Sequence, residues 1–325
     1  MQLGIKKLCS KLALVALPFL LFFILISVRT PYVLYIQQAS MDDKVAKLVL
    51  DAPKTPEVII AGDSRAEANL IPSAFTQESG YTSTNVAVGG TSLTQAYTAL
   101  AGGGVFNRKP LIILSVSAYD INDALFDVQH DDLQVVENEP WGAQKIKDAL
   151  KYYKAFAGYY LIHFKNVLSF NSVDNIHITA AQLQTGGYVP QSGVLNVLAG
   201  TPANPDTAWY AGARTGGLHQ AEFIRSLKTL GATGVPIVIY IGPTAPLWSE
   251  ENESQTIQTI DKQFAQIISQ TIAPYPNMHF IDFQDRVNPD LPNNLFVDRI
   301  HLTEAGAATF STVLADTLKK DGIIK

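Results

Sequence analysis

Residues 57–65 read EVIIAGDSR. The first six residues of this stretch form a short run, rich in β-branched side chains and bounded by turn signals, which is typical of a buried parallel strand. Ser64 follows this run, at the turn from strand to helix. In such a turn the serine hydroxyl is exposed at the carboxyl edge of the sheet, and backbone N–H groups face the same space. The stretch therefore predicts a parallel strand that presents a serine.

Four further segments have the same look of buried parallel strands: TNVAVGG (84–90), PLIILSVS (110–117), PIVIYIGP (236–243) and MHFIDF (278–283). Helical patterns separate or follow them, at 92–102, 218–231, 254–272 and 303–320. Thr303 is the expected N-cap of the last helix. Alternation of this kind predicts an α/β fold with a doubly wound, mainly parallel sheet between two helix layers. Reactive groups in such sheets gather at the carboxyl ends of the strands.

A stretch of about 100 residues after the third predicted strand, residues 120–217, lacks this alternation of strand and helix patterns. It holds an aromatic-rich helical pattern at 141–168 and then a region rich in Gly, Pro, Asn and Thr. Loops this long inside a compact domain usually carry function or are disordered. We interpret the stretch as an insertion that caps the active face. Its aromatic side chains either pack within it or stack on sugar rings: Trp141, Tyr152, Tyr153, Tyr159, Tyr160 and Trp209.

The N-terminal region predicts a membrane anchor. Residues 12–28, LALVALPFLLFFILISV, carry no charge, and the apolar character resumes at residues 32–36, past Arg29. A spanning helix needs about 20 mostly apolar residues. Because basic residues stay on the cytoplasmic side, the tail 1–11 should lie inside and the rest of the chain outside. The other interpretation is a cleaved secretory signal, and both export the body of the protein.

This organisation divides the chain into four parts. They are the basic cytoplasmic tail 1–11, the transmembrane anchor 12–36, a connector at 37–56, and a catalytic domain at 57–320 that contains the insertion. The expected location is the cell membrane, with a single span and an extracytoplasmic domain, which would be periplasmic in a Gram-negative cell.

Charge and cysteine content exclude several classes of function. The formal net charge is -5, and the first 29 residues hold four basic residues and no acidic one, so the remainder carries -9. A body this acidic has no general affinity for nucleic acid. The single cysteine, Cys9, allows neither an intrachain disulfide nor a Cys-rich metal site. No histidine spacing indicates a metal site, and no metal or organic cofactor is expected.

Two further segments supply groups that would act with Ser64. Gly90 ends the second strand pattern, where its N–H can point at a developing oxyanion. Asp298 and His301 stand three residues apart before the last helix. In a tight turn, this spacing puts the carboxylate on one imidazole nitrogen while the other faces the nucleophile. Simpler roles stay open: Ser64 as a turn cap, His301 as a surface histidine, Gly90 as a positive-φ glycine, and Asp63 as a structural turn residue.

These motifs together resemble the SGNH (GDSL-type) hydrolase family. G-D-S at 62–64, N-x-x-x-x-G at 85–90 and D-x-x-H at 298–301 are similar to its blocks I, II and V in order and spacing, and the resemblance covers 57–318 apart from the insertion. It implies a flavodoxin-like three-layer fold. It also implies roles for Ser64 as nucleophile and oxyanion donor, Gly90 as a second donor, His301 as base and Asp298 as its orienter.

One block departs from the family pattern. The third block usually reads Gly-x-Asn-Asp, and its Asn helps to bind the oxyanion. Here the strand continues as LIILSVSAYDIND, residues 111–123, and Ser117 aligns with that Asn. Asn122 lies five residues further on. The third oxyanion donor is therefore open between Ser117 and Asn122.

The anchor, Arg65 and the SVSAYD stretch (115–120) resemble a membrane-tethered branch of the family. Members of that branch work with membrane-bound O-acyltransferases on cell-wall or exported polymers. The expected function is O-acetyl transfer onto a polysaccharide through a Ser-His-Asp acyl-enzyme. An esterase that removes such groups is the alternative. The hypothesis from outside the enzymes is a catalytically silent scaffold that binds a polymer or a membrane partner.

Overall fold

The computed structural model describes residues 36–122, 177–193, 215–248, 255–284 and 291–325, together with the single residues Leu17, Gly142, Ala143 and Ile146. A five-stranded sheet with the order β2-β1-β3-β4-β5 forms its centre. The strands are β1 (Val58–Gly62), β2 (Ser83–Asn85), β3 (Leu111–Ser115), β4 (Ile237–Ile241) and β5 (Met278–Asp282). Every neighbouring pair is parallel. The five predicted strands and the parallel α/β sheet are confirmed, in the strand order of flavodoxin-like folds.

The second strand is shorter than its sequence pattern suggests. Ladder pairing with β1 ends at Asn85. The chain beyond it still follows β1, because the Val86 N–H donates to the Ile60 carbonyl (2.8 Å) and the Val88 N–H to the Gly62 carbonyl (3.1 Å). Residues 86–91 therefore form a loop held against the carboxyl end of β1.

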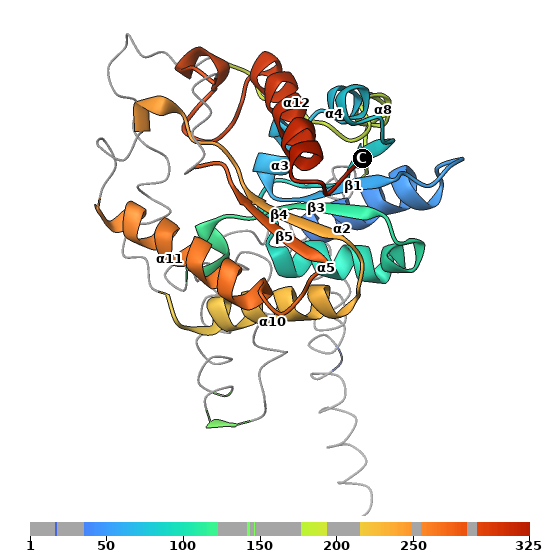
Figure 1. Ribbon diagram of the computed structural model, residues 1–325. Coiled ribbons are helices and arrows are strands. Elements are labelled where there is room, and N and C mark those ends of the chain that lie inside the picture. The colour runs from blue at the N-terminus through green and yellow to red at the C-terminus, as the bar shows by residue number, and fades with distance from the viewer. Residues whose placement is uncertain are drawn as a thin grey trace, which may run out of the picture.

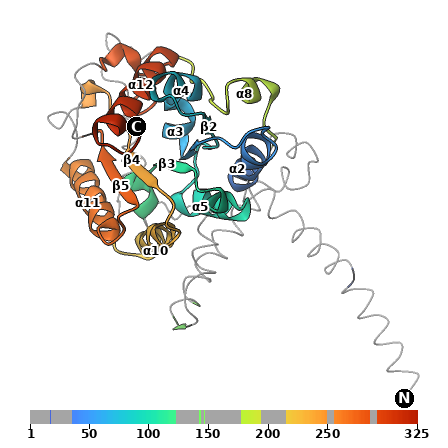
Figure 2. The same ribbon diagram turned by 45° about the vertical axis from the view of Figure 1, so that its right-hand side comes forward.

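Helices cover both faces of the sheet (Figures 1 and 2). One face carries α3 (Ser64–Asn69), α4 (Pro72–Ser79) and α12 (Glu304–Lys320); the other carries α2 (Ile36–Val45), α5 (Leu93–Gly102), α10 (Leu218–Ala232) and α11 (Gln255–Ile272). Successive strand residues supply the two cores in turn. Ile59 belongs to the core that α2, α5, α10 and α11 share, and Ile60 to the core of α3, α4 and α12. This alternation is the period-two geometry of a strand buried on both faces.

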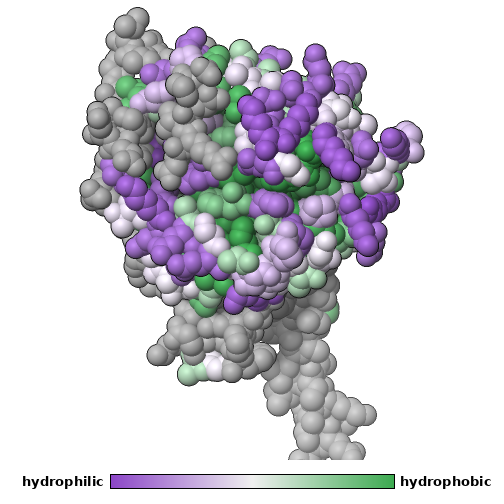
Figure 3. Space-filling view, viewed as in Figure 1, coloured by the Kyte–Doolittle hydropathy of each residue, from purple (hydrophilic) through white to green (hydrophobic). Residues whose placement is uncertain are grey.

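Short elements complete the described chain: η1 (Ala46–Leu50, one π-helical turn), η2 (Val105–Arg108), η3 (Ala118–Ile121), α8 (Ala180–Gln184), η7 (Pro246–Trp248) and η8 (Asn293–Leu295). Figure 3 shows hydrophobic residues in a band across the middle of one face, with hydrophilic residues above and below it. In Figure 1 the sheet lies at this level, between its two helix layers.

The last helix begins as predicted. The Thr303 hydroxyl accepts a hydrogen bond from the Gly306 N–H (3.2 Å), and Lys319 and Lys320 lie in the final turn. The capping bond satisfies one of the free N–H groups of the first turn, and the lysines lie favourably in the field of the helix dipole.

The segment before β1 is packed into the domain. Within residues 37–56, interpreted as a connector, α2 and η1 place Met41, Val45 and Val49 in the core, each at most 1% exposed. The helix α2 runs from Ile36 to Val45, and η1 continues it to Leu50. The folded unit therefore includes α2 and η1, because its core is incomplete without these three side chains.

One described piece of the insertion, residues 177–193, covers the β2 edge of the sheet. The Asn85 N–H donates to the Gly186 carbonyl (2.8 Å), which also accepts from the Thr84 hydroxyl (3.1 Å). Gly187 has φ 97°, and a Cβ there would lie 1.8 Å from the Asn85 carbonyl oxygen. Covering an edge strand removes a row of unpaired backbone groups. Most of the insertion, including its six singled-out aromatic residues, lies outside the described residues.

The predicted anchor at 12–36 also lies outside them, apart from Leu17 and Ile36. Across the described ranges, no helix has both the length and the apolar character that a membrane span requires. The anchor stays a prediction.

Truncation tests where the domain starts. Removal of residues 1–35 should leave a folded, soluble body, whereas removal of residues 1–50 should unfold it or lower its melting temperature sharply. Burial of a large apolar side chain contributes about 1.5–3 kcal/mol, and the longer deletion removes three from a domain whose total stability is on the order of 5–15 kcal/mol. Thermal unfolding followed by circular dichroism measures both proteins. Equal melting temperatures would contradict the packing of α2 and η1.

Candidate active site

The turn after β1 has little freedom in its backbone. Gly62 has φ 122°, and a Cβ there would lie 2.4 Å from the Ser115 carbonyl oxygen, so only glycine fits. Asp63 is the N-cap of α3, and its Oδ1 accepts from the Arg65 N–H (3.1 Å) and the Ser115 hydroxyl (2.9 Å). The structural role expected for Asp63 is therefore confirmed. Ser64 is the first residue of α3, just beyond the carboxyl end of β1.

Three predicted residues form one hydrogen-bonded chain. Ser64 Oγ lies 2.8 Å from His301 Nε2, and His301 Nδ1 lies 2.7 Å from Asp298 Oδ2. The His301 side chain is 20% exposed, so a substrate can reach it. With the Nδ1 proton donated to the carboxylate, Nε2 is free to accept the serine proton. The arrangement has the geometry of a serine-hydrolase triad.

Asp298 is held as an ionised carboxylate. Its Oδ1 accepts the N–H groups of Ile300 (2.9 Å) and His301 (2.8 Å), while Oδ2 faces the imidazole. Burial is the largest single influence on its pKa and acts to raise it. The hydrogen bond and charge of His301, with the two backbone N–H groups, together outweigh burial, so the pKa lies below its ordinary value. The carboxylate can therefore orient the imidazole and stabilise its protonated form.

Asn69 fixes the His301 segment to the helix that carries Ser64. Its Nδ2 donates to the Ile300 carbonyl (2.7 Å), and its Oδ1 accepts from the Leu302 N–H (2.8 Å). These groups flank His301 on both sides, and Asn69 is fully buried at the end of α3. Sequence reasoning missed this residue. The one signal in the sequence was the residue type. A helix that faces a core usually has an apolar residue at such a position, and here an asparagine stands five positions after Ser64.

Arg299, between the two predicted catalytic residues, was also missed. It is fully buried, and its guanidinium lies 3.5 Å from the Asp261 carboxylate on α11. Its carbonyl accepts from the Ala245 N–H (2.9 Å), just beyond β4. The D-x-x-H turn is thus attached to α11 and to the β4 side of the sheet.

The oxyanion side is formed by the turn at Ser64 and the loop 86–91. Gly90 has φ 76°, so its need for a positive φ is confirmed. Within the part of the chain that the structure describes, the backbone N–H groups of Ser64 and Gly90 donate to no other protein group. The oxyanion roles predicted for Ser64 and Gly90 stay predictions.

The third donor is not decided by these contacts. Ser117 is 4% exposed and begins η3, and its N–H donates to Asp120 Oδ2 (3.1 Å). Asn122 is 1% exposed and ends the same turn. As for a metal, no group of three or more His, Cys, Asp or Glu side chains in the described ranges is arranged to hold one.

Neither a protein-family model nor a curated protein matches this sequence, whereas solved structures do. An acetyl xylan esterase, AlAXEase, matches at 13% identity and a TM-score of 0.40, over 81% of this chain and 98% of that one. A lipase/acylhydrolase from Enterococcus faecalis matches at 10% and 0.40, over 82% and 97%. A candidate SGNH hydrolase from Slackia heliotrinireducens matches at 13% and 0.38, over 80% and 97%. Likenesses at this level concern the fold alone, so the chemistry proposed for this chain rests on its own side chains.

The triad predicts the effect of three substitutions. Ser64→Ala and His301→Ala should each lower kcat on an activated ester by about 10⁴–10⁶-fold, because the members act as a unit. Asp298→Asn should cost about 10⁴-fold or less, since it disturbs the imidazole tautomer and charge. Steady-state kinetics measures this, with Ser73→Ala, an exposed serine on α4, as the control. A Ser64→Ala protein that kept more than about a tenth of the wild-type rate would exclude Ser64 as nucleophile.

The Asn69 contacts predict a kinetic defect without loss of a catalytic group. Asn69→Leu leaves the Ile300 carbonyl and the Leu302 N–H unpaired, and a misplacement of about 1 Å can cost about 10²-fold in rate. We expect kcat to fall about 10- to 100-fold. Asn277→Leu is the matched control, since it removes a comparable bond to the Val235 carbonyl (2.8 Å) at the other end of the sheet. If kcat fell by a similar factor in both proteins, general destabilisation would explain the loss, and the positioning role of Asn69 would be contradicted.

Proposed function

We propose that this chain is a serine ester hydrolase or acyltransferase of the SGNH type. The observation that carries the proposal is the hydrogen-bonded chain Ser64–His301–Asp298, next to two backbone N–H groups that donate to no other group in the described residues. A serine hydroxyl is a poor nucleophile until a base takes its proton, and here an oriented imidazole lies within reach.

The reaction follows from this geometry in two halves. His301 Nε2 takes the Ser64 proton as Oγ attacks the ester carbonyl, and the N–H groups of Ser64 and Gly90 stabilise the tetrahedral oxyanion. The C–O bond to the leaving alcohol breaks, the alcohol receives the proton from His301, and an acyl-serine remains. An incoming hydroxyl then gives its proton to His301 as it attacks the acyl carbonyl. The bond from the acyl carbon to Ser64 Oγ breaks, and His301 returns the proton to Oγ.

The incoming hydroxyl decides between the two classes of reaction. Water gives hydrolysis, and a sugar hydroxyl gives transfer, while the protein groups act in the same way in both. We propose transfer of O-acetyl groups to an exported or cell-wall polysaccharide, by an enzyme held at the outer face of the membrane through residues 12–36. The apolar N-terminal run and the resemblance to the tethered branch support this. A membrane-bound O-acyltransferase is the partner that would supply the acyl group. An esterase acting on such polymers is the alternative, because its triad would be the same.

A labelling and partition experiment tests the proposal. A fluorophosphonate should label the wild-type protein at Ser64, found by peptide mass spectrometry, and should not label Ser64→Ala. With 4-nitrophenyl acetate as donor, added oligosaccharide should become acetylated in a reaction that Ser64→Ala does not support. Labelling with release of acetate alone, at every acceptor concentration, would support the esterase. A folded wild-type protein that is not labelled would be a silent scaffold and would overturn the proposal.

A further inference from the structure

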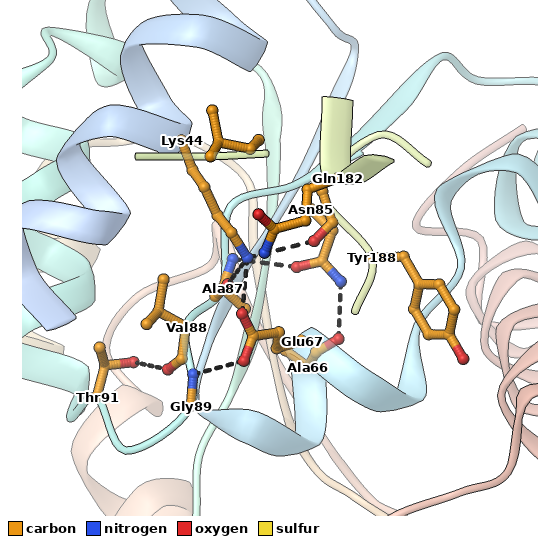
Figure 4. Close-up of polar contacts among 12 residues, drawn as sticks. Lys44, Ala66, Glu67, Asn85, Ala87, Val88, Gly89, Thr91, Gln182 and Tyr188 are labelled. Atoms are coloured by element: carbon orange, nitrogen blue, oxygen red, sulfur yellow. Dashed lines mark hydrogen bonds and ion pairs between the residues drawn. The ribbon is translucent and has the colours of Figure 1, made fainter. Parts of the chain in front are cut away.

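A buried ion pair lies beside the triad without belonging to it. Lys44 on α2 and Glu67 on α3 are joined at 2.8 Å, with side chains 3% and 15% exposed. Lys44 Nζ also donates to the carbonyls of Ala87 (2.6 Å) and Gly187 (3.2 Å). Figure 4 shows the Lys44 ammonium beside Ala87, with the Glu67 carboxylate between the ammonium and Gly89. All three donors of the ammonium are therefore used.

Such a pair is not explained by stability alone. Moving two charges out of water costs several kcal/mol per ion, and buried pairs are often no more stabilising than apolar residues of the same size. Their distinctive property is that they define one geometry, because each charge must keep its partners. The structural question is what this pair holds in place.

Glu67 connects the pair to the oxyanion side. It stands three residues after Ser64 on α3, and its Oε2 accepts the Gly89 N–H at 2.8 Å while Oε1 faces Lys44. Gly89 lies against the nucleophile, because a Cβ built on it would be 3.4 Å from Ser64 Cβ. The next residue is Gly90, whose N–H is the proposed second donor. One carboxylate therefore bridges the ammonium and the residue that precedes the donor.

The rest of the loop is held from the opposite side. The Gly62 carbonyl accepts from the Val88 N–H (3.1 Å) and the Thr91 hydroxyl (2.7 Å), on the two sides of Gly89 and Gly90. In the described residues, the side-chain hydrogen bond to Gly89 itself comes from Glu67. An oxyanion donor works only when it is preorganised close to its final position.

We propose that Lys44 and Glu67 are positioning residues for the oxyanion loop, and that the Glu67–Gly89 hydrogen bond is the contact through which they act. Lys44 holds the carboxylate by its charge and the Ala87 carbonyl by a hydrogen bond, so the loop is held at two points. The inference rests on the proposed function, because it concerns the donor at Gly90. It extends the site to α2, the helix that follows the predicted anchor.

The test separates the hydrogen bond from the charge. In a Lys44→Met background, which leaves no buried ammonium without its partner, Glu67→Gln keeps an oxygen that can accept the Gly89 N–H. Glu67→Met has a similar length and no acceptor. We expect Lys44→Met/Glu67→Met to have a kcat about 10- to 100-fold below that of Lys44→Met/Glu67→Gln, with KM within about threefold. Loss of a whole oxyanion donor costs about 10²–10³-fold, and displacement should cost less.

Controls and a second variant keep the result interpretable. Lys47→Met removes a lysine of the adjoining η1 turn whose pair with Asp51 is exposed, and it should leave kcat unchanged. Melting temperatures report stability, and the rate of fluorophosphonate labelling should fall in parallel with kcat. If the double variants do not fold, Glu67→Asp in the wild-type background keeps the charge but shortens the reach, and it should lower kcat with little change in KM.

Equal kcat values for folded Gln and Met double variants would overturn the inference, whatever their melting temperatures. Full activity of a folded Glu67→Asp protein would do the same if the double variants cannot be measured. Failure of the proposed function is a distinct outcome, since the wild-type protein itself would then not be labelled at Ser64.

Discussion

The hydrogen bond between Ser64 Oγ and His301 Nε2 joins two residues 237 positions apart at a distance of 2.8 Å. Much of the surrounding structure fixes its two ends. Gly62 allows the chain to turn against β3 so that the serine stands at the edge of the sheet. Asn69 then holds the backbone on both sides of the histidine, and it lies on the same short helix as the serine. The two ends of the catalytic bond therefore share one support, and a shift of α3 would move them together.

The loop that carries the predicted oxyanion donor Gly90 is supported by a different set of contacts. The loop after β2 is held by the Gly62 carbonyl and by the Glu67 carboxylate, and Glu67 is held by Lys44 from α2. The described part of the insertion joins the same network, since the Gly187 carbonyl accepts from Lys44 and the Val189 N–H donates to the Glu67 carbonyl (3.2 Å). The helices α2 and α3 and residues 177–193 of the insertion thus meet beside the loop that follows β2.

The packing of α2 shows that the segment predicted to connect the anchor to the catalytic domain is itself part of the folded domain. In the described chain, α2 fills core space with Met41 and Val45 and contributes Lys44 to the support of the loop. If residues 12–36 cross the membrane, the first helix outside it is already part of the folded domain.

The strand pattern, the cap at Thr303 and the residues Ser64, Asp298 and His301 were all predicted from the sequence. These predictions were possible because each feature is marked by residues a few positions away. The marks are a run of β-branched residues, a turn and a three-residue spacing. Asn69, Arg299, Lys44 and Glu67 could not be, because each acts through groups 22 to 233 positions away along the chain. No local pattern shows that a lysine or an asparagine will be buried, since its cost depends on partners that only the folded chain brings near. Local sequence therefore determined which groups form the hydrogen-bonded chain of the candidate site, and tertiary packing alone decided which polar side chains hold them in place.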